Sequence, residues 1–317
     1  MRREIASIAA MATILVGSQA IAIALSPLFV ENSFQAFPNP GDVTNTAVYI
    51  IMILAFTAVI LGLVRYRRQN LAKYVIMASI FVTLAFIFLL PLYYGLYYVT
   101  GGNLNGDLLV DLSTALAFAL AALLVYVLVK FPEWYVVDTV GIVTAVGVTA
   151  ILGISFSTFP AILLLLALAV YDAWAVYRTK HMITLADELT SQRLPILLVI
   201  PKKAGYSFRE QKSLKEQVAS GEEREAMFVG LGDLIIPGIL SVSAFTFLSP
   251  SGRSILGLLS NEIVALGTIL GSLVGFLVLM RFVLKGNPQA GLPLLNGGAL
   301  VGFLITNLLV YGYLKIL

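Results

Sequence analysis

The chain has 317 residues, of which 59% are hydrophobic and 12% are charged, and its formal net charge is +3. A soluble domain carries about 25% charged residues, so this composition excludes a soluble globular protein and predicts a protein that crosses a membrane many times. The sequence holds no cysteine, which excludes disulfides, thiol catalysis and thiolate-bound metals. Its single histidine, His181, cannot build an HExxH zinc site. We therefore expect no metal, no organic cofactor and no nucleic-acid partner.

Runs of about 20 apolar residues mark helices that cross a bilayer, and nine such runs occur along the chain. The first is longer than the apolar segment of a signal peptide and lacks a cleavage site, so we interpret it as a retained span. The pattern predicts an all-α polytopic membrane protein with two parts, residues 1–177 and 226–317, separated by a cytosolic loop, 178–225. The expected spans are residues 5–30, 46–64, 73–98, 108–129, 135–153, 159–177, 226–248, 255–280 and 291–314.

The positions of the basic residues predict how these spans are oriented. If the N-terminus is cytosolic, 18 of the 20 Lys and Arg residues fall in cytosolic segments, and only Arg253 and Lys315 fall outside. Cytosolic loops of membrane proteins carry this excess of positive charge. We therefore expect a multi-pass protein of the cell membrane with its N-terminus inside and its C-terminus outside.

Two aspartates lie within consecutive spans that run in opposite directions. Asp172 is six residues before Arg178, and Asp233 is eight residues after Glu225. At a rise of ~1.5 Å per residue they lie about 9 Å and about 12 Å from the cytosolic ends of their helices. The two carboxylates are thus expected at similar depth from the same face of the membrane.

An ionisable side chain inside a span is a functional-site hypothesis by default. Two facing carboxylates in a medium of low dielectric constant share one proton, so one can activate a water molecule while the other protonates a carbonyl oxygen. Gly230 and Gly232, which precede Asp233, would leave room for a substrate backbone. This pattern predicts a hydrolase that cleaves peptide bonds within the membrane.

At these residues the sequence resembles the GxGD intramembrane aspartyl proteases, presenilin and signal peptide peptidase. Tyr171-Asp172 is similar to the YD motif of that family, and Gly230-Leu231-Gly232-Asp233 is similar to its GxGD motif. The third family motif, PALP, corresponds to Ala290-Gly291-Leu292-Pro293, which keeps only the leucine and the second proline. The resemblance covers the whole chain, including the number of spans and the long loop after the sixth.

The resemblance implies a presenilin-like fold, closest to a prokaryotic, archaeal homologue, and cleavage of transmembrane helical proteins or peptides in the lipid bilayer. Asp172 and Asp233 would be the catalytic pair. Tyr171, Gly230, Leu231, Gly232 and residues 290–293 would contact the substrate. Animal presenilin works with partner subunits, but the sequence shows no need for an obligatory partner here, and assembly into a homo-oligomer stays open.

A proton- or ion-coupled transporter or channel is the main alternative, because paired carboxylates within spans also suit ion translocation. Six spans followed by three do not divide into inverted repeats, however. The two aspartates also lie nearer one face, whereas transport sites lie near the midplane. We therefore favour the protease.

Three further features carry expectations of their own. The apolar run 194–201, "LPILLVIP", is strand-like and is interpreted as lying in the membrane surface or, less favoured, as occupying the groove of the site. Asp138 is expected to be a solvated or a helix-N-terminal carboxylate, favoured by the helix dipole, with a role as a third acidic group in the site as the lesser alternative. The glycines at 267, 271 and 275 share one face of a span and predict close helix packing, within the monomer or between copies.

Overall fold

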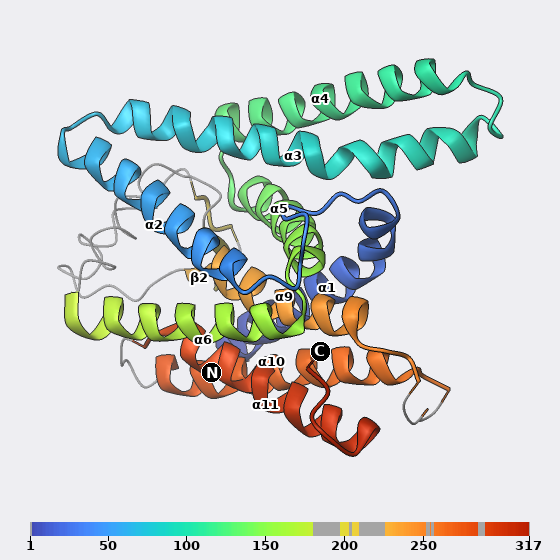
Figure 1. Cartoon of the computed structure of the whole chain (residues 1–317). Coiled ribbons are helices and arrows are strands. Elements are labelled where there is room, and N and C mark those ends of the chain that lie inside the picture. Colours follow the sequence, from blue (N-terminus) through green and yellow to red (C-terminus); the bar gives the residue numbers. More distant parts are fainter. Residues whose placement is uncertain are drawn as a thin grey trace.

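The computed structural model describes residues 2–179, 197–202, 205–208, 226–251, 254, 257–284 and 289–316. His181, most of the loop 178–225 and the first residues of the 194–201 run lie outside this part of the chain. The described residues form nine α-helices, one π-helical turn and a two-stranded sheet (Figure 1). The elements are α1 (Arg2–Glu31), α2 (Thr44–Arg65), α3 (Gln69–Val99), α4 (Gly106–Lys130), α5 (Trp134–Ser155), α6 (Thr158–Trp174), η1 (Ala175–Thr179), β1 (Leu197–Pro201), β2 (Ala226–Gly230), α9 (Leu231–Phe247), α10 (Ser260–Leu284) and α11 (Gly291–Tyr311).

Eight of the described helices are long and apolar enough to cross a membrane, and α9 is a shorter apolar helix. The expected all-α, multi-pass fold is therefore confirmed. The expected span 226–248 is wrong at its beginning, because residues 226–230 form strand β2 and the helix begins only at Leu231. Gly230 is extended, with φ −65° and ψ 138°, and glycine weakens a helix. The span expected from residue 255 likewise begins later, at Ser260.

Helix α9 lies at the centre of the bundle. It contacts α1, α5, α6, α10 and α11, and most of its residues are buried on all sides (Figure 1). A helix that is apolar all round belongs in the interior of a large protein or a membrane domain. The surrounding helices therefore fix the position of α9 and of Asp233 in its first turn.

Strands β1 and β2 form an antiparallel pair directly before α9. Leu197 lies opposite Gly230, and Pro201 lies opposite Ala226. β1 packs against α5 and α1, and its three central residues, 198–200, are buried. The strand-like character expected for this run is thus confirmed for residues 197–201. The run does not form an exposed apolar patch, because α1 and α5 cover residues 198–200.

The periphery of the bundle is formed by α2 and by the α3–α4 hairpin (Figure 1). α2 buries only Asn45, Thr46 and Ile60, and the Thr46 hydroxyl donates to the Pro160 carbonyl of α6 at 3.0 Å. Just before α2, the Thr44 backbone N–H donates to Asp42 and lowers the pKa of this exposed carboxyl. α2 is therefore tied to α6 near the beginning of both helices, while most of its apolar surface faces outward.

The most extensive helix contact joins α10 and α11, and it is built on glycine. A Cβ at Gly271 would overlap the carbonyl oxygen of Gly298, and a Cβ at Gly275 would overlap the carbonyl oxygen of Leu294. Gly267 faces Thr306 in the same way. The glycine stripe of α10 thus packs within the monomer, as the first of the two expectations stated. This contact sets the position of α11, which begins at Gly291.

Gly271→Ala is expected to destabilise the bundle by about 1–3 kcal/mol, since the added methyl group would force two helix backbones apart. The matched control is Gly297→Ala on α11, where a Cβ would meet nothing within 4 Å. Unfolding of both variants in detergent, followed by circular dichroism against temperature, measures the difference. Equal midpoints for the two variants would contradict the packing role of Gly271.

Candidate active site

Asp172 lies near the end of α6 and is buried, with 6% of its surface exposed. Its Oδ2 accepts a hydrogen bond from the Leu292 backbone N–H, in the first turn of α11, at 3.1 Å. After Trp174 the helix widens into the π-helical turn η1, a conformation that is often found at functional sites. The Tyr177 hydroxyl of this turn donates to Gln289 at 2.8 Å. Two hydrogen bonds therefore join the end of α6 to the beginning of α11.

Asp233 is the third residue of α9 and is half-buried. Its carboxylate lies against Gly291, where a Cβ would be 2.9 Å from Oδ2 and 3.0 Å from Oδ1. Asp172 and Asp233 thus meet consecutive residues, Leu292 and Gly291. The structure brings together the two aspartates that the sequence placed on neighbouring helices.

The depth expected for Asp233 is wrong. Asp233 is in the first turn of its helix, rather than about 12 Å inside it, because the five residues before α9 are strand. Both carboxylates therefore lie at helix N-termini, Asp233 at that of α9 and Asp172 at that of α11. The unpaired N–H groups and the helix dipole favour negative charge at such positions. A carboxylate can be held there inside a membrane without a basic partner.

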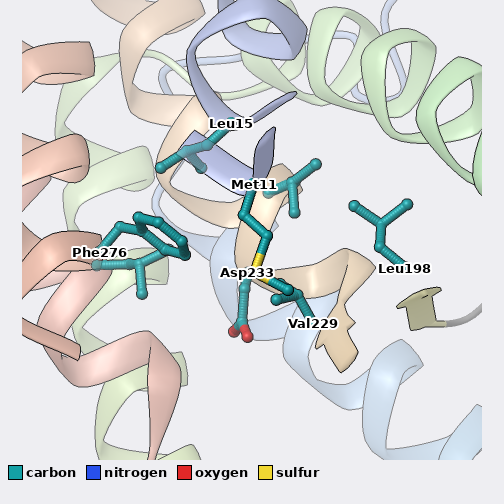
Figure 2. A pocket seen from close by; sticks show the side chains of 8 residues that line it. Met11, Leu15, Leu198, Val229, Asp233 and Phe276 are labelled. Carbon is teal, nitrogen blue, oxygen red and sulfur yellow. The ribbon is translucent and has the colours of Figure 1, made fainter. Parts of the chain in front are cut away.

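One side of Asp233 borders an apolar pocket (Figure 2). Figure 2 shows its carboxylate oxygens pointing away from Leu15 and Leu198, so the polar atoms face out of the group of apolar side chains. The aspartate is the one polar side chain that lines this pocket. The lining residues are Met11, Leu15, Leu198, Val229, Asp233, Leu234, Phe276 and Leu295.

The residues before Asp233 differ in their surroundings. Leu231 is buried, and its side chain lies 3.2 Å from the Cβ that Gly141 of α5 would carry. Gly232 is exposed, and a Cβ there would meet no described atom within 4 Å. At Gly230 a Cβ would meet only the Asp233 side chain, at 3.7 Å. The room expected beside Asp233 therefore exists and is not filled by the described part of the chain.

The remaining residues that the sequence placed in the site differ in their burial and in their contacts with the two carboxylates. Ala290 is buried and is the N-cap residue of α11, and Pro293 is half-buried in its first turn. Gly291 and Leu292 contact the two carboxylates, as described above. Tyr171 is 38% exposed, so it is less enclosed than the neighbouring Asp172.

Asp138 was misjudged from the sequence. It is buried, with 7% of its surface exposed, and its Oδ1 accepts a hydrogen bond from the Val199 backbone N–H of β1 at 2.8 Å. The expectation of a solvated carboxylate is therefore wrong. Its partner lies 61 residues further along the chain, so the local pattern "WYVVDTV" gave no signal of the contact. Among the described residues, no group of three His, Cys, Asp or Glu side chains gathers to hold a metal ion.

Comparison with known proteins gives consistent matches. The family model described as "Signal-peptide peptidase, presenilin aspartyl protease" matches residues 12–311. A crystal structure of a presenilin family intramembrane aspartate protease, in space group C222, is 35% identical, with 95% of this chain and 99% of that chain covered and a TM-score of 0.65. A structure with the same description in space group P2 is 36% identical, covers 95% of this chain and 97% of that chain, and gives a TM-score of 0.62. A search of curated protein sequences gave no match.

The fold, with its paired carboxylates at two helix N-termini, is that of an intramembrane aspartyl protease. The chain belongs to the signal-peptide peptidase and presenilin family. Membership of this family confirms the protease interpretation over the transporter alternative, and it confirms a multi-pass membrane protein.

Gly291→Val is expected to lower the rate of peptide cleavage by at least about tenfold, because a displacement of about 1 Å in an active site can cost a hundredfold. The added side chain would push the Asp233 carboxylate from its position, while the unfolding midpoint should move little. Gly297→Val, on the same helix but in open space, is the control. The rate with a saturating transmembrane peptide measures the effect, and equal rates for both variants would contradict it.

Proposed function

We propose that Asp172 and Asp233 are the catalytic pair of an endopeptidase that hydrolyses peptide bonds within the membrane. The observation that carries this proposal is the meeting of both carboxylates at the N-terminus of α11, through Leu292 and Gly291. The pair holds one proton in its working state. The ionised carboxylate takes a proton from a water molecule, and the protonated one gives its proton to the carbonyl oxygen of the substrate. The tetrahedral intermediate then breaks its C–N bond as the amine receives a proton.

The substrate is a transmembrane helical protein or peptide whose helix opens locally, because a peptide bond inside a helix is not accessible to two carboxylates. The empty room at Gly232 lies beside Asp233 and supports the approach of an extended backbone. In an antiparallel pair, opposite residues alternate between hydrogen-bonded and non-bonded pairs. Because the Val199 N–H points to Asp138, the pair Val199–Phe228 is non-bonded, and the backbone of Phe228 faces away from β1. This outer edge of β2 is where an extended substrate would add as a strand.

The attachment of α2 at the far end of α6 supports lateral access to Asp172 from the bilayer. Tyr171, which adjoins Asp172 in α6, is 38% exposed. α2 is tied to α6 near Pro160, at the opposite end of that helix. A substrate helix would therefore reach the site from the membrane rather than from water.

The distribution of Lys and Arg supports a cytosolic N-terminus, with the catalytic pair toward the cytosolic face. Each part of the chain, 1–177 and 226–317, would supply one carboxylate, with the loop 178–225 between them. We infer that the chain cleaves its substrate without a partner subunit, whether as a monomer or as a homo-oligomer.

Asp172→Asn and Asp233→Asn are each expected to abolish cleavage while preserving the fold, since the isosteric amide fills the same space but cannot exchange the proton. The assay uses the chain purified alone in detergent, a substrate with one transmembrane helix, and mass spectrometry of the products. Asp111→Asn, at an exposed carboxylate of α4, is the control and should cleave normally. Cleavage that survives in either site variant would refute the assignment of the pair.

The cleavage rate is expected to pass through a maximum at mildly acidic to neutral pH, because only the singly protonated pair holds both an acid and a base. Loss of the shared proton at high pH removes the acid, and addition of a second proton at low pH removes the base. The rate with a saturating peptide, measured from acidic to alkaline pH with the folded fraction monitored in parallel, tests this. A rate that rises steadily into the alkaline range would contradict a shared proton.

A further inference from the structure

Asp138 is a buried carboxylate of α5 that the proposed chemistry does not use. Burial of a carboxylate is costly unless a hydrogen bond or a charge compensates it. Among the described residues, the hydrogen bond that compensates it comes from a backbone group, the Val199 N–H at the centre of β1. This hydrogen bond attaches one residue of β1 to one residue of α5, so it can fix where the strand lies along the helix.

The bond lies on the outer edge of β1, the side that faces away from β2. The residues whose backbone faces outward alternate along the strand, so Leu197, Val199 and Pro201 share this edge. Pro201 lacks a backbone N–H, so it needs no acceptor on this edge. Its carbonyl oxygen accepts a hydrogen bond from the Ser7 hydroxyl of α1 at 3.4 Å. The outer edge of β1 is thus occupied by α5 and α1, which leaves the outer edge of β2 for pairing with another strand.

The same face of α5 also supports the beginning of α9. Asp138, Gly141 and Ala145 follow each other at spacings of three and four residues, which places them on one face of the helix. A Cβ at Gly141 would lie 3.2 Å from Leu231 and 3.6 Å from Leu198. One face of one helix therefore touches β1 and the residue two positions before Asp233.

The register of the two strands determines which residue of β2 lies opposite each residue of β1. A slip of one residue in a strand turns every side chain to the other face of the sheet. With Val199 held by Asp138, Leu197 lies opposite Gly230, three residues before Asp233. A different register would change how β1 supports the backbone of β2 where it enters α9, and with it the direction of the outer edge of β2 beside the carboxylate.

We propose that Asp138 is a positioning residue, which accepts the Val199 N–H, fixes the register of β1 and β2 on α5, and thereby selects the substrate peptide bond that reaches the carboxylates. This role rests on the proposed catalytic pair. It differs from a purely structural role because it governs where the substrate is cut as well as how fast.

The test compares Asp138→Asn and Asp138→Leu in the purified chain, with a substrate of one transmembrane helix and mass spectrometry of all products. Asn keeps an oxygen that can accept the N–H, so Asp138→Asn should keep the parent cleavage positions. Leu has a similar size and no acceptor, so Asp138→Leu should cleave at least about tenfold more slowly and spread its cuts over neighbouring bonds. Asp111→Leu, at an exposed carboxylate of α4, is the matched control and should behave as the parent chain.

Parent rate and parent cleavage positions in Asp138→Leu would overturn the proposal. Equal impairment of Asp138→Asn and Asp138→Leu would also overturn it, because the charge and not the acceptor would then matter. These results are separable from the identity of the catalytic pair, since loss of that pair abolishes cleavage at every position.

A second variant keeps the test informative if Asp138→Leu does not fold. Val199→Pro removes the donor, and it breaks no bond between the strands because the Val199 N–H points to Asp138. In the double variant Asp138→Leu/Val199→Pro, neither partner is left unpaired, and such paired replacements cost little stability. The proposal expects this folded double variant to cut at scattered positions. Parent cleavage positions in it would show that the bond does not set the register and would overturn the proposal.

Discussion

The cost of holding negative charge within a membrane governs the architecture of this protein. A carboxylate in hydrocarbon needs a partner. Here the Leu292 N–H at the N-terminus of α11 donates to Asp172, and Asp233 lies in the first turn of α9, where the helix dipole favours negative charge. The other elements hold these two N-termini together. Glycine lets α10 bring α11 close, five helices surround α9, and the β1–β2 pair fixes the backbone that enters α9.

The contacts of Gly291 give a physical reason for one departure from the family motif. The sequence has Ala290-Gly291 where the motif has proline and alanine, and the structure places the Asp233 carboxylate directly against the Gly291 Cα. Without a side chain at that residue, the carboxylate reaches the first turn of α11 beside Asp172. The degenerate motif is thus compatible with close approach of the two aspartates, and the contact that matters runs through the backbone of Gly291 and Leu292.

Much of the fold and the pairing of the aspartates follow from local patterns in the sequence. Apolar length predicts the helices, and helix direction together with charge predicts that Asp172 and Asp233 lie near each other. The errors arise where distant segments meet. Residues 226–230 were expected to be helical because hydropathy does not reveal the pairing of β2 with β1. Asp138 was expected to be solvated because the strand that covers it, β1, lies far along the chain. The contacts of α11 with the carboxylates depend on glycine packing, so only the family resemblance indicated them.

The short, enclosed helix α9 has a consequence for how the protein is made. It has 17 residues and carries an aspartate in its first turn, whereas an independent span needs about 20 apolar residues. As this helix leaves the ribosome it is a poor candidate for membrane insertion by itself. Its stable place is created by the surrounding helices, of which α1, α5 and α6 are synthesised earlier and α10 and α11 later. Stable insertion of α9 therefore depends on helices made before it and after it, and the site is complete only once α11, the last helix, has packed against both carboxylates.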